Sequence, residues 1–389
     1  MNLAARLDRL RGQSPPAEED ALAARLRRMR RGPARQSRSG APPAVLGQAV
    51  AADSERDGLL RRDRAHALPA SSGPSTDLAM LPEVCELSGC DWVYLDTETT
   101  GLSGGVGNLA FMVGAARYAA DGSLQVRQWL LGRFAAEAGM LSELLDWVGR
   151  EAVLVSYNGK CFDLPLLTAR LGMHRIDHRL ATLPHLDLMY GVRRAYRRHW
   201  PDCRLQTAEQ RLLGLHRDDD LPGAEAPGAW RAWIEEGAVR PLQRVLEHNF
   251  QDVASLALLH RRLVADYAGS ARPGVDHAAI GRAWQSVGRV GQARRVLECA
   301  GDALDETGRL QLASLYRRQG AWSAAEALWL DLYRRGCSVA ASELSKYYEH
   351  RRRDYRKAVG YAKACDPAER GARLGRLRLK LGANLPLPW

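Results

Sequence analysis

The middle of the chain consists of short apolar or alternating runs and longer helical patterns. Four of the short runs have the length and composition of β-strands, and in chain order they read DWVYLDTE, FMVGAARY, LQVRQWLLG and AVLVSYN. Short turns that contain Gly or Asp, such as AADGS at 119–123, separate the first three runs. These turns predict an antiparallel meander, whereas the fourth strand is reached through a helix.

Helical periodicity fills most of the remainder of this region. Apolar residues recur at helical spacing in EAGMLSELLDWVGR, FDLPLLTARLG, CRLQTAEQRLLG and PLQRVLEHNFQDVASLALLHRRLVADY. A meander followed by strands that are connected through helices predicts an α/β fold with a mixed sheet flanked by helices. We place this domain at residues 85–268.

Residues 275–389 lose strand character and repeat themselves. Three segments can be superimposed, AWQSVGRVGQARRVL, LYRRQGAWSAAEALW and YYEHRRRDYRKAVGYA. Gly288 and Gly320 are 32 residues apart, as are Ala293 and Ala325, and Ala358 follows 33 residues later. This period is close to the roughly 34 residues of tetratricopeptide repeats. We therefore predict an all-α, tetratricopeptide-like repeat domain that presents a surface to a protein partner.

The first part of the chain, residues 1–75, is rich in Ala, Arg, Pro, Ser and Gly. Its stretch GPARQSRSGAPPA has no periodicity, which predicts a basic, largely disordered N-terminal segment. Two short pieces flanked by arginine nevertheless have helical spacing, at Leu3, Leu7 and Leu10 and at Leu22, Leu26 and Met29. They fit either a weakly helical solvated tail or a basic docking helix for nucleic acid or a partner protein.

Composition narrows the class of protein. The formal net charge of +11 favours a polyanionic partner such as nucleic acid, although many basic proteins have other functions. Seven scattered cysteines form no CxxC pair, which predicts reduced thiols rather than disulfides or a zinc site. No apolar stretch approaches the roughly 18–20 residues that span a bilayer, and the N-terminus lacks the apolar core of a secretory signal. We expect a cytoplasmic protein without a membrane segment.

The stretch VYLDTETTGLSGGVGN at 93–108 combines acids with glycines. It lacks the lysine and hydroxyl of a GxxxxGK[ST] phosphate loop, and no GxGxxG precedes a helical pattern. In a strand, Asp96 and Glu98 project from the same face, where two carboxylates repel each other unless a cation neutralises them. Mg²⁺ or Mn²⁺ would suit such oxygen ligands, whereas a pair of solvated acids at the rim of a sheet is the alternative.

Two further acids occupy similar positions. Asp163 follows an apolar strand and begins a helix, where an acid also caps free backbone N–H groups. Asp252 lies four residues after His248 in a helical pattern, so the two side chains share one face. They could form a surface pair, but the apolar residues around them predict that part of this face looks inward. Asp187 in HLDLMY is a further acid, for which hydrogen bonding in the core is the favoured role.

Three motifs carry a resemblance to a known family. DTETTGL, YNGKCFDLPLL and HNFQDVASL are similar, in this order, to the three exonuclease motifs of the DEDD superfamily of ribonuclease H-like 3′→5′ exonucleases. The further segments LDLMY, LQTAEQRLLGL and RDDDLPG resemble more narrowly the YprB-type bacterial family. That family often has a tetratricopeptide-like C-terminal part and includes MrfB-like DNA-repair exonucleases associated with a helicase. The resemblance covers residues 88–265 well and the repeats loosely.

The resemblance implies a catalytic site. Asp96, Glu98, Asp163 and Asp252 match the four metal-binding acids, and two Mg²⁺ or Mn²⁺ ions would bind the scissile phosphate. His248 is the candidate general base. Members with a His base usually place it five residues before the last Asp and members with a Tyr base four, so this chain has a His at the Tyr spacing. Four further residues are expected to bind the terminal nucleotide: Thr99, Gly101, Leu102, which would pack against its base, and Asn158.

The sequence thus predicts a metal-dependent 3′→5′ exonuclease that acts on DNA in repair and binds a partner protein, such as a helicase, through its repeats. Two alternatives remain open. One is a catalytically silent scaffold, although none of the four acids is missing. The other is the same chemistry on RNA, since both nucleic acids contain the same phosphodiester. The loop residues Arg217, Asp219 and Asp220 would lie beside the cleft, and the basic run MYGVRRAYRRHW could follow a phosphate backbone or be a solvated helix face.

Overall fold

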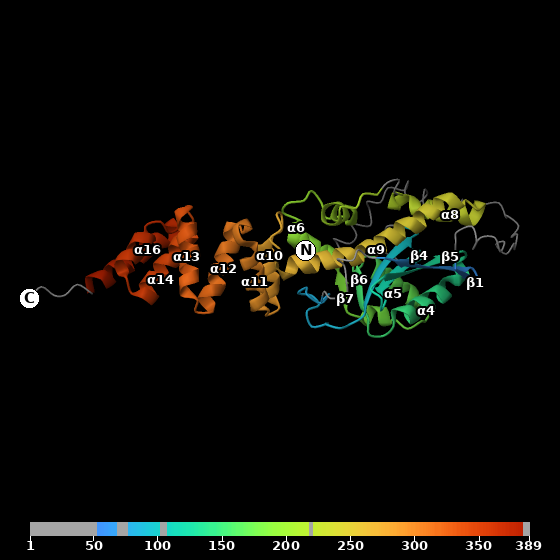
Figure 1. Cartoon of the computed structure of the whole chain (residues 1–389), viewed down its shortest axis with the longest axis horizontal. Coiled ribbons are helices and arrows are strands. Elements are labelled where there is room, and N and C mark those ends of the chain that lie inside the picture. The colour runs from blue at the N-terminus through green and yellow to red at the C-terminus, as the bar shows by residue number, and fades with distance from the viewer. Residues whose placement is uncertain (1–52, 68–76, 102–106, 218–220, 384–389) are drawn as a thin grey trace, which may run out of the picture. The chain divides into compact units, whose positions relative to one another are not determined.

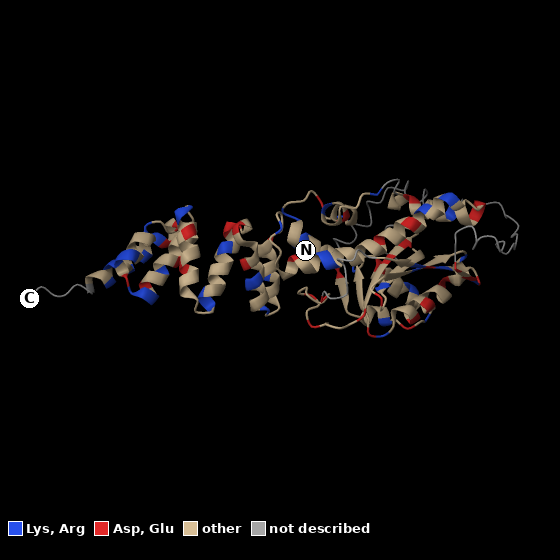
Figure 2. Cartoon of the chain, in the orientation of Figure 1, with Lys and Arg blue, Asp and Glu red and all other residues tan. Residues whose placement is uncertain are grey.

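The computed structural model describes residues 53–67, 77–101, 107–217 and 221–383. By its contacts the chain divides into residues 1–44, which lie outside the described ranges together with the two predicted N-terminal helical pieces, and residues 45–389. A seven-stranded sheet and its helices are followed by a wholly helical part (Figure 1). Basic and acidic residues are distributed over both parts (Figure 2). No described helix is long and apolar enough to cross a membrane.

The sheet is mixed, as predicted. Its strands are β1 (Ser54–Arg56), β2 (Leu59–His66), β3 (Trp92–Thr99), β4 (Ala110–Tyr118), β5 (Leu124–Leu131), β6 (Val153–Ser156) and β7 (His185–Asp187). The spatial order is β1-β2-β5-β4-β3-β6-β7. Strands β3, β4 and β5 form the antiparallel meander, whereas β6 and β7 add in parallel beyond β3. This arrangement makes β3, which contains the DTET motif, a central strand.

Residues 54–66 differ from the expectation for the N-terminal segment, because they are strands β1 and β2 rather than disordered chain. Strand β2 pairs antiparallel with β5 over its whole length. Its basic residues also have a partner, since Arg64 Nη1 lies 2.6 Å from Glu247 Oε1 on the long helix α9 (Val239–Gly269). Only Leu59 and Leu60 of this strand are buried apolar residues. Ion pairs and backbone hydrogen bonds therefore hold β2 on the sheet, although its sequence lacks a strong apolar pattern.

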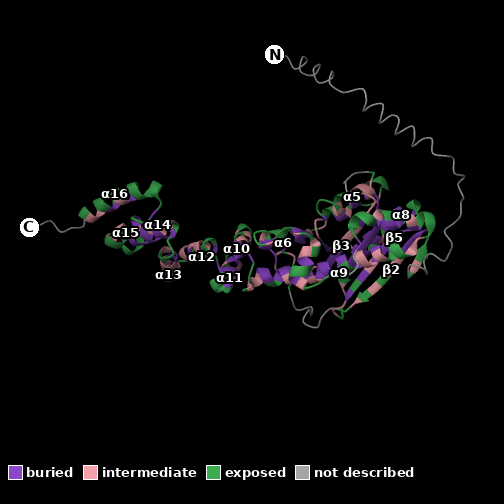
Figure 3. Ribbon diagram, turned by 90° about the horizontal axis from the view of Figure 1, so that it is seen from above, coloured by how far each residue is buried: buried purple, intermediate pink, exposed green. Residues whose placement is uncertain are grey.

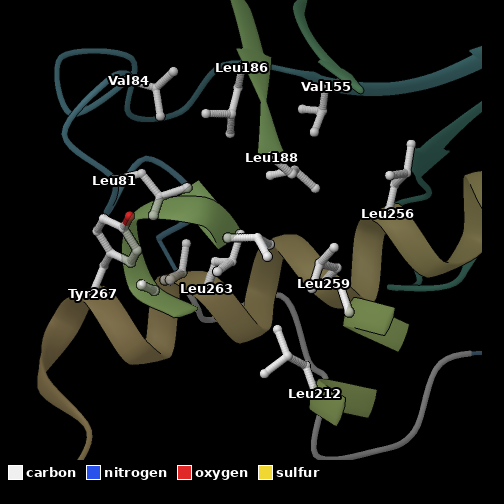
Figure 4. Packing of buried hydrophobic residues seen from close by; sticks show 14 of the residues in the cluster. Leu81, Val84, Val155, Leu186, Leu188, Leu212, Leu256, Leu259, Leu263 and Tyr267 are labelled. Atoms are coloured by element: carbon white, nitrogen blue, oxygen red, sulfur yellow. The ribbon is translucent and has the colours of Figure 1, made fainter. Parts of the chain in front are cut away.

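Alternation along the strands divides the apolar core between the two faces of the sheet. Trp92 and Tyr94 of β3 belong to one cluster, and Val93 and Leu95 belong to the other. Helices α6 (Leu188–Tyr196) and most of α9 contribute to the first cluster. Helices α4 (Glu137–Val148), α5 (Asp163–Met173) and α8 (Ala226–Glu236), together with the first turns of α9, contribute to the second. Figure 3 shows the buried positions of α9, and Figure 4 shows side chains of α9 packed between β7, α6 and neighbouring segments.

Helix α9 connects the sheet with the helical part. It has 31 residues and therefore extends over about 46 Å. Its later turns contribute Leu263 and Tyr267 to an apolar cluster that also contains Trp284 and Leu297 of the following helices. Trp284 Nε1 donates a hydrogen bond to the Tyr267 carbonyl at 3.0 Å. The core under α6 and α9 thus continues into residues beyond 275, while the division into separate domains near residue 270 stays a prediction.

The helical part is a series of hairpins. Its helices are α10 (His277–Ser286), α11 (Val290–Ala300), α12 (Glu306–Arg318), α13 (Trp322–Arg334), α14 (Ser338–Tyr347), α15 (Tyr355–Ala362) and α16 (Pro367–Ala383). Gly288 and Gly320 turn the first two hairpins with φ of 75° and 76°, a conformation that favours glycine. Three alanines, one in the second helix of each pair, are fully buried where the helices meet: Ala293, Ala325 and Ala358. The repeated helix–turn–helix unit is confirmed, and its assignment as tetratricopeptide-like stays a prediction.

Glu349 ties α16 to the π-helical segment Tyr348–Arg352 and gives a pH-dependent prediction. Burial on its own would raise the pKa of Glu349, but hydrogen bonds from Arg376 and Lys380, at 3.0 and 2.8 Å, lower it to about 2. Because the folded pKa lies below the unfolded value, the stabilisation is complete above about pH 4.5 and is lost as the pH falls through 2. We expect Glu349→Gln to lower the free energy of unfolding at pH 7 by roughly 2 kcal/mol in urea titrations.

At acid pH the same substitution should matter much less. At pH 2 about half of the wild-type carboxyls are protonated, and below it the charge that strengthens the hydrogen bonds is lost, so the two proteins should converge in stability as the pH falls through 2. An equal loss of stability at neutral and acid pH would contradict the assignment of the effect to this charge.

Candidate active site

Strand β3 places the first two acids. Asp96 and Glu98 alternate with Thr97, so the acids point toward α9 and Thr97 points to the opposite face, where its hydroxyl donates to Asp163. The pairing register with β4 shifts between Glu98 and Thr99. This irregularity ends the regular ladder directly after the acids, where the chain turns away from the sheet.

One face of α9 meets these acids. Asn249 Nδ2 donates to Asp96 Oδ2 at 2.9 Å. His248 Nε2 lies 3.9 Å from Glu98 Oε1 and 3.5 Å from Asp252 Oδ2, one helical turn further along. Asp252 is 8% exposed and Asn249 is fully buried, so this face of α9 looks inward. The structure therefore brings three of the four predicted metal ligands, together with His248, between β3 and α9.

Asp163 approaches from the loop between β6 and α5. It is the first residue of α5 and lies close to Gly159, where a Cβ atom would come within 2.9 Å of Asp163 Oδ2 and 2.4 Å of Ser156 Oγ. A side chain at Gly159 would therefore displace the acid. The adjacent Asn158 adopts φ of 67°, and its amide N–H donates to Asp187 Oδ1 at 2.8 Å.

The Asp187 carboxylate holds this loop in place by accepting hydrogen bonds from backbone N–H groups. Besides Asn158, its carboxylate accepts from the amide of Lys160 at 3.2 Å and from that of Met189 at 3.1 Å, the latter as the N-cap of α6. These are the core hydrogen bonds favoured for Asp187 from the sequence. The residue thus fixes the position of Asn158 and, through the loop, of Asp163.

Burial raises the pKa values of all four acids, and repulsion from the other acids raises those of Asp96 and Glu98 further. Burial, followed by repulsion from Asp252, Asp163 and Glu98, raises the pKa of Asp96 well above its ordinary value. Burial raises the pKa of Glu98 to about 8 although His248 opposes it, and burial raises the pKa of Asp163 to about 6 although the Thr97 hydroxyl opposes it. The pKa of Asp252 is also raised by burial, against His248 and Arg217. So much buried negative charge calls for cations.

The guanidinium of Arg217 is a cation that lies beside these acids. Its guanidinium forms an ion pair with Asp252 and donates from Nη1 to His248 Nδ1 at 3.1 Å. It is anchored by Glu209, whose two oxygens accept from Nε at 2.9 Å and from Nη2 at 2.6 Å. Because a guanidinium only donates, Nδ1 of a neutral His248 is an acceptor, and the ring proton sits on Nε2, toward Glu98 and Asp252. For His248 to act as a base at Nε2, Arg217 must first move or the ring must turn.

The donor set fits a hard divalent ion, because it consists of carboxylate oxygens. Within the described ranges, however, no three His, Cys, Asp or Glu side chains are already positioned to hold a metal ion. The guanidinium on Asp252 is one physical reason, since the same carboxylate cannot bind Arg217 and close around an ion in the same geometry. Asp96, Glu98, Asp163 and Asp252 are the residues that would hold the metal.

We expect Arg217→Gln to separate two roles of this arginine, which are to neutralise the buried acids and to compete with a metal ion for Asp252. Without the guanidinium, the buried acids lose a neutralising partner, so the melting temperature of the metal-free protein should fall. Mn²⁺ should bind several-fold more tightly in calorimetric titrations, because the competitor for Asp252 is gone. A weaker Mn²⁺ affinity in the variant would show instead that Arg217 stays in place and supports the metal-bound site.

A pocket of about 200 Å³ opens beside the acids. Five predicted residues line it, Asp96, Thr99, Gly101, Asn158 and Asp163. Phe162, of which 48% is exposed, also contributes to its wall. The predicted nucleotide contact Leu102 and the loop acids Asp219 and Asp220 lie outside the described residues. Two of the four acids thus share one cavity with Thr99, Gly101 and Asn158, three of the expected substrate-binding residues.

Sequence reasoning missed the residues that hold the acids in place. Asn249 is fixed by Gln128 Nε2, which donates to its Oδ1 at 2.9 Å, and it fits only because Gly114 on β4 has no side chain. A Cβ atom at Gly114 would lie 2.2 Å from Asn249 Oδ1. A glycine inside the strand-like run FMVGAARY was the available signal, since such glycines mark a close approach.

Comparison with known proteins agrees with this architecture. The RNase H superfamily model matches residues 93–264, from β3 to α9. The chain is also 34% identical over 283 residues to a protein of Bacillus subtilis (strain 168), covering 69% of this chain and 67% of that protein. Residues 93–264 therefore form a domain of the RNase H superfamily. The Bacillus relative is the uncharacterized protein YprB, and the two chains are members of one family.

A solved structure with a similar portion is that of the family B DNA polymerase from the archaeon Pyrobaculum calidifontis. The match has a TM-score of 0.38 at 15% identity and covers 59% of this chain and 29% of the polymerase.

The RNase H superfamily domain suggests a nuclease, that is, a hydrolase of phosphodiester bonds. Nucleases of this kind generally use divalent metal ions.

Proposed function

We propose that the protein is a divalent-metal-dependent 3′→5′ exonuclease that acts on DNA, in repair, together with a helicase partner. The observation that carries the proposal is the convergence of four carboxylates from three distant segments on one site. Asp96 and Glu98 come from β3, Asp163 from α5 and Asp252 from α9, and burial raises the pKa of each, so that their ionised forms are costly without a bound cation. Acid clusters that are costly to the fold are typical of functional sites.

The chain's own residues divide the work. Two bound Mg²⁺ or Mn²⁺ ions would activate a water molecule and stabilise the leaving oxygen at the phosphodiester. Asn249 holds Asp96 and the Thr97 hydroxyl holds Asp163, so two of the ligands are preorganised. The pocket beside them would receive the 3′-terminal nucleotide. His248 remains the candidate for taking the proton of the attacking water.

End-labelled strands test the proposal. Wild-type protein with Mn²⁺ or Mg²⁺ should shorten a 5′-labelled DNA strand stepwise, release a 3′ label as a mononucleotide, and stop when the metal is chelated. Matched RNA strands with the same labels show the sugar preference. Faster digestion of RNA would replace DNA by RNA as the substrate. Protein that is inert on single- and double-stranded DNA and RNA with either metal would instead be a nucleic-acid-binding scaffold.

A further inference from the structure

The helical repeats contain a second pocket, of about 420 Å³, which we call the repeat pocket. Its wall combines one acidic residue, Glu343, with six basic ones: Arg317, Lys346, His350, Arg351, Arg373 and Arg376. Helices α12, α14 and α16, every second helix of the series, contribute most of these side chains. Figure 2 shows Lys and Arg on α14 and α16. The pocket is therefore built on one face of the repeat stack and is strongly basic.

Pairing within the protein leaves part of this charge unbalanced, although Arg376 already pairs with Glu349 at 3.0 Å. Glu343 is shared between Arg317 Nη1 at 3.0 Å and Lys346 Nζ at 2.7 Å. Arg373 is only 7% exposed, and its Nη2 reaches Glu369 at 2.9 Å. Its Nε, however, is buried and has no acceptor among the described residues. A buried donor without an acceptor is destabilising, so an anionic group that reached this Nε would be stabilised there.

The aromatic residues of the repeat pocket are engaged with the protein itself. Trp322 stacks on Tyr347 with ring centroids 5.7 Å apart, and the Arg351 guanidinium carbon lies 5.5 Å from the Trp322 centroid. Tyr347 and Trp329 are 5% and 2% exposed. Proteins that bind single-stranded nucleic acid instead present open aromatic faces on which bases stack. The pocket thus offers cations rather than a stacking platform.

We propose that the repeat pocket binds an acidic segment of a partner protein, whose Asp and Glu carboxylates pair with Arg351 and Arg373. Stacked helical repeats present extended surfaces on one side, which suit an extended peptide. Arginines bind carboxylates through two parallel hydrogen bonds, and arginine clusters are a recurring means of recognising acidic motifs. The proposal does not rest on the nuclease activity, since binding is measured without nucleic acid or metal.

A labelled peptide tests the proposal on the full-length protein. The probe is a fluorescent peptide of about ten residues that alternates Asp and Glu with Ala, and the reference peptide has Asn and Gln in their place. At about 150 mM salt, we expect fluorescence anisotropy to show binding of the acidic peptide at least about tenfold tighter than of the reference. Arg351→Gln, at an exposed position, and Arg373→Gln should each weaken binding about fivefold or more.

Arg356→Gln is the matched control, because Arg356 is exposed on α15 outside the repeat pocket and its loss changes the net charge equally. It should change the affinity less than about twofold. Equal effects of all three variants would show non-specific attraction and overturn the proposal. It would also be overturned if a single-stranded oligonucleotide bound more tightly than the peptide and lost affinity in Arg351→Gln, since the pocket would then be a nucleic-acid site.

Discussion

Asp163→Asn is expected to abolish nucleic-acid hydrolysis while leaving the protein folded. The substitution keeps the shape of the side chain and an oxygen that accepts from the Thr97 hydroxyl, but it removes one of the four negative charges that would hold the metal. Because bound ions would supply both the activated water and the stabilisation of the leaving oxygen, we expect a loss of about a thousandfold or more in the rate of nucleotide release. Single-turnover assays with 5′-labelled DNA measure this rate.

The melting temperature of Asp163→Asn distinguishes a loss of catalysis from damage to the fold. Burial raises the pKa of Asp163 to about 6, so the group is ionised at neutral pH and its charge adds to the repulsion that raises the pKa of Asp96. Asp163→Asn removes that repulsion, and the melting temperature of the metal-free protein should stay the same or rise. Asp146→Asn on α4 is the matched control, since 85% of the Asp146 side chain is exposed. It should change neither the rate of nucleotide release nor the melting temperature. An inactive variant that melts well below wild type would leave Asp163 with a structural role.

Most of the fold could be predicted because its elements bury regular apolar patterns. The meander of β3, β4 and β5 and the long helix α9 follow directly from alternation and from helical periodicity. The same reasoning overlooked β2, whose sequence LLRRDRAH reads as charged chain. Its arginines are satisfied by tertiary partners such as Glu247, nearly two hundred residues away. A strand held by partners so distant in sequence leaves little local signal.

The candidate site likewise contains residues that the sequence predicts and residues that it does not. The acids were predicted because they stand in motifs, each at the end of a strand or on a helix face. The residues that position them have no motif, since their roles depend on packing between elements. Arg217 reaches Asp252, 35 residues later, only because Glu209 anchors it beside α9. Sequence reasoning placed Arg217 near the cleft but could not assign the partners of its guanidinium, or the tautomer that it imposes on His248.

Gly114→Ala is expected to disable the site from a position that contacts no substrate. Gly114 lies opposite Asp96 on β4, and Asn249 of α9 fills the space above it. The added Cβ atom would lie 2.2 Å from Asn249 Oδ1 and 2.9 Å from Val253 Cγ2, so α9 must move away from the sheet. Overpacking of a buried contact costs roughly 1–3 kcal/mol, which urea unfolding measures. Because α9 also holds Asp252, a shift of about 1 Å should lower activity about a hundredfold.

A double-mutant cycle identifies the clash as the cause. Asn249→Ala alone should destabilise the protein, because Asp96 loses the hydrogen bond from Asn249 Nδ2 and Gln128 loses one of its two acceptors. Combined with Gly114→Ala, it should cost less than the sum of the two single substitutions, since the smaller side chain gives the new methyl group room. Gly139→Ala is the control, because a Cβ atom there meets nothing within 4 Å and the position is helical, so stability should hold or rise slightly. Strictly additive losses in the cycle would show that Gly114 matters for a reason other than its contact with Asn249.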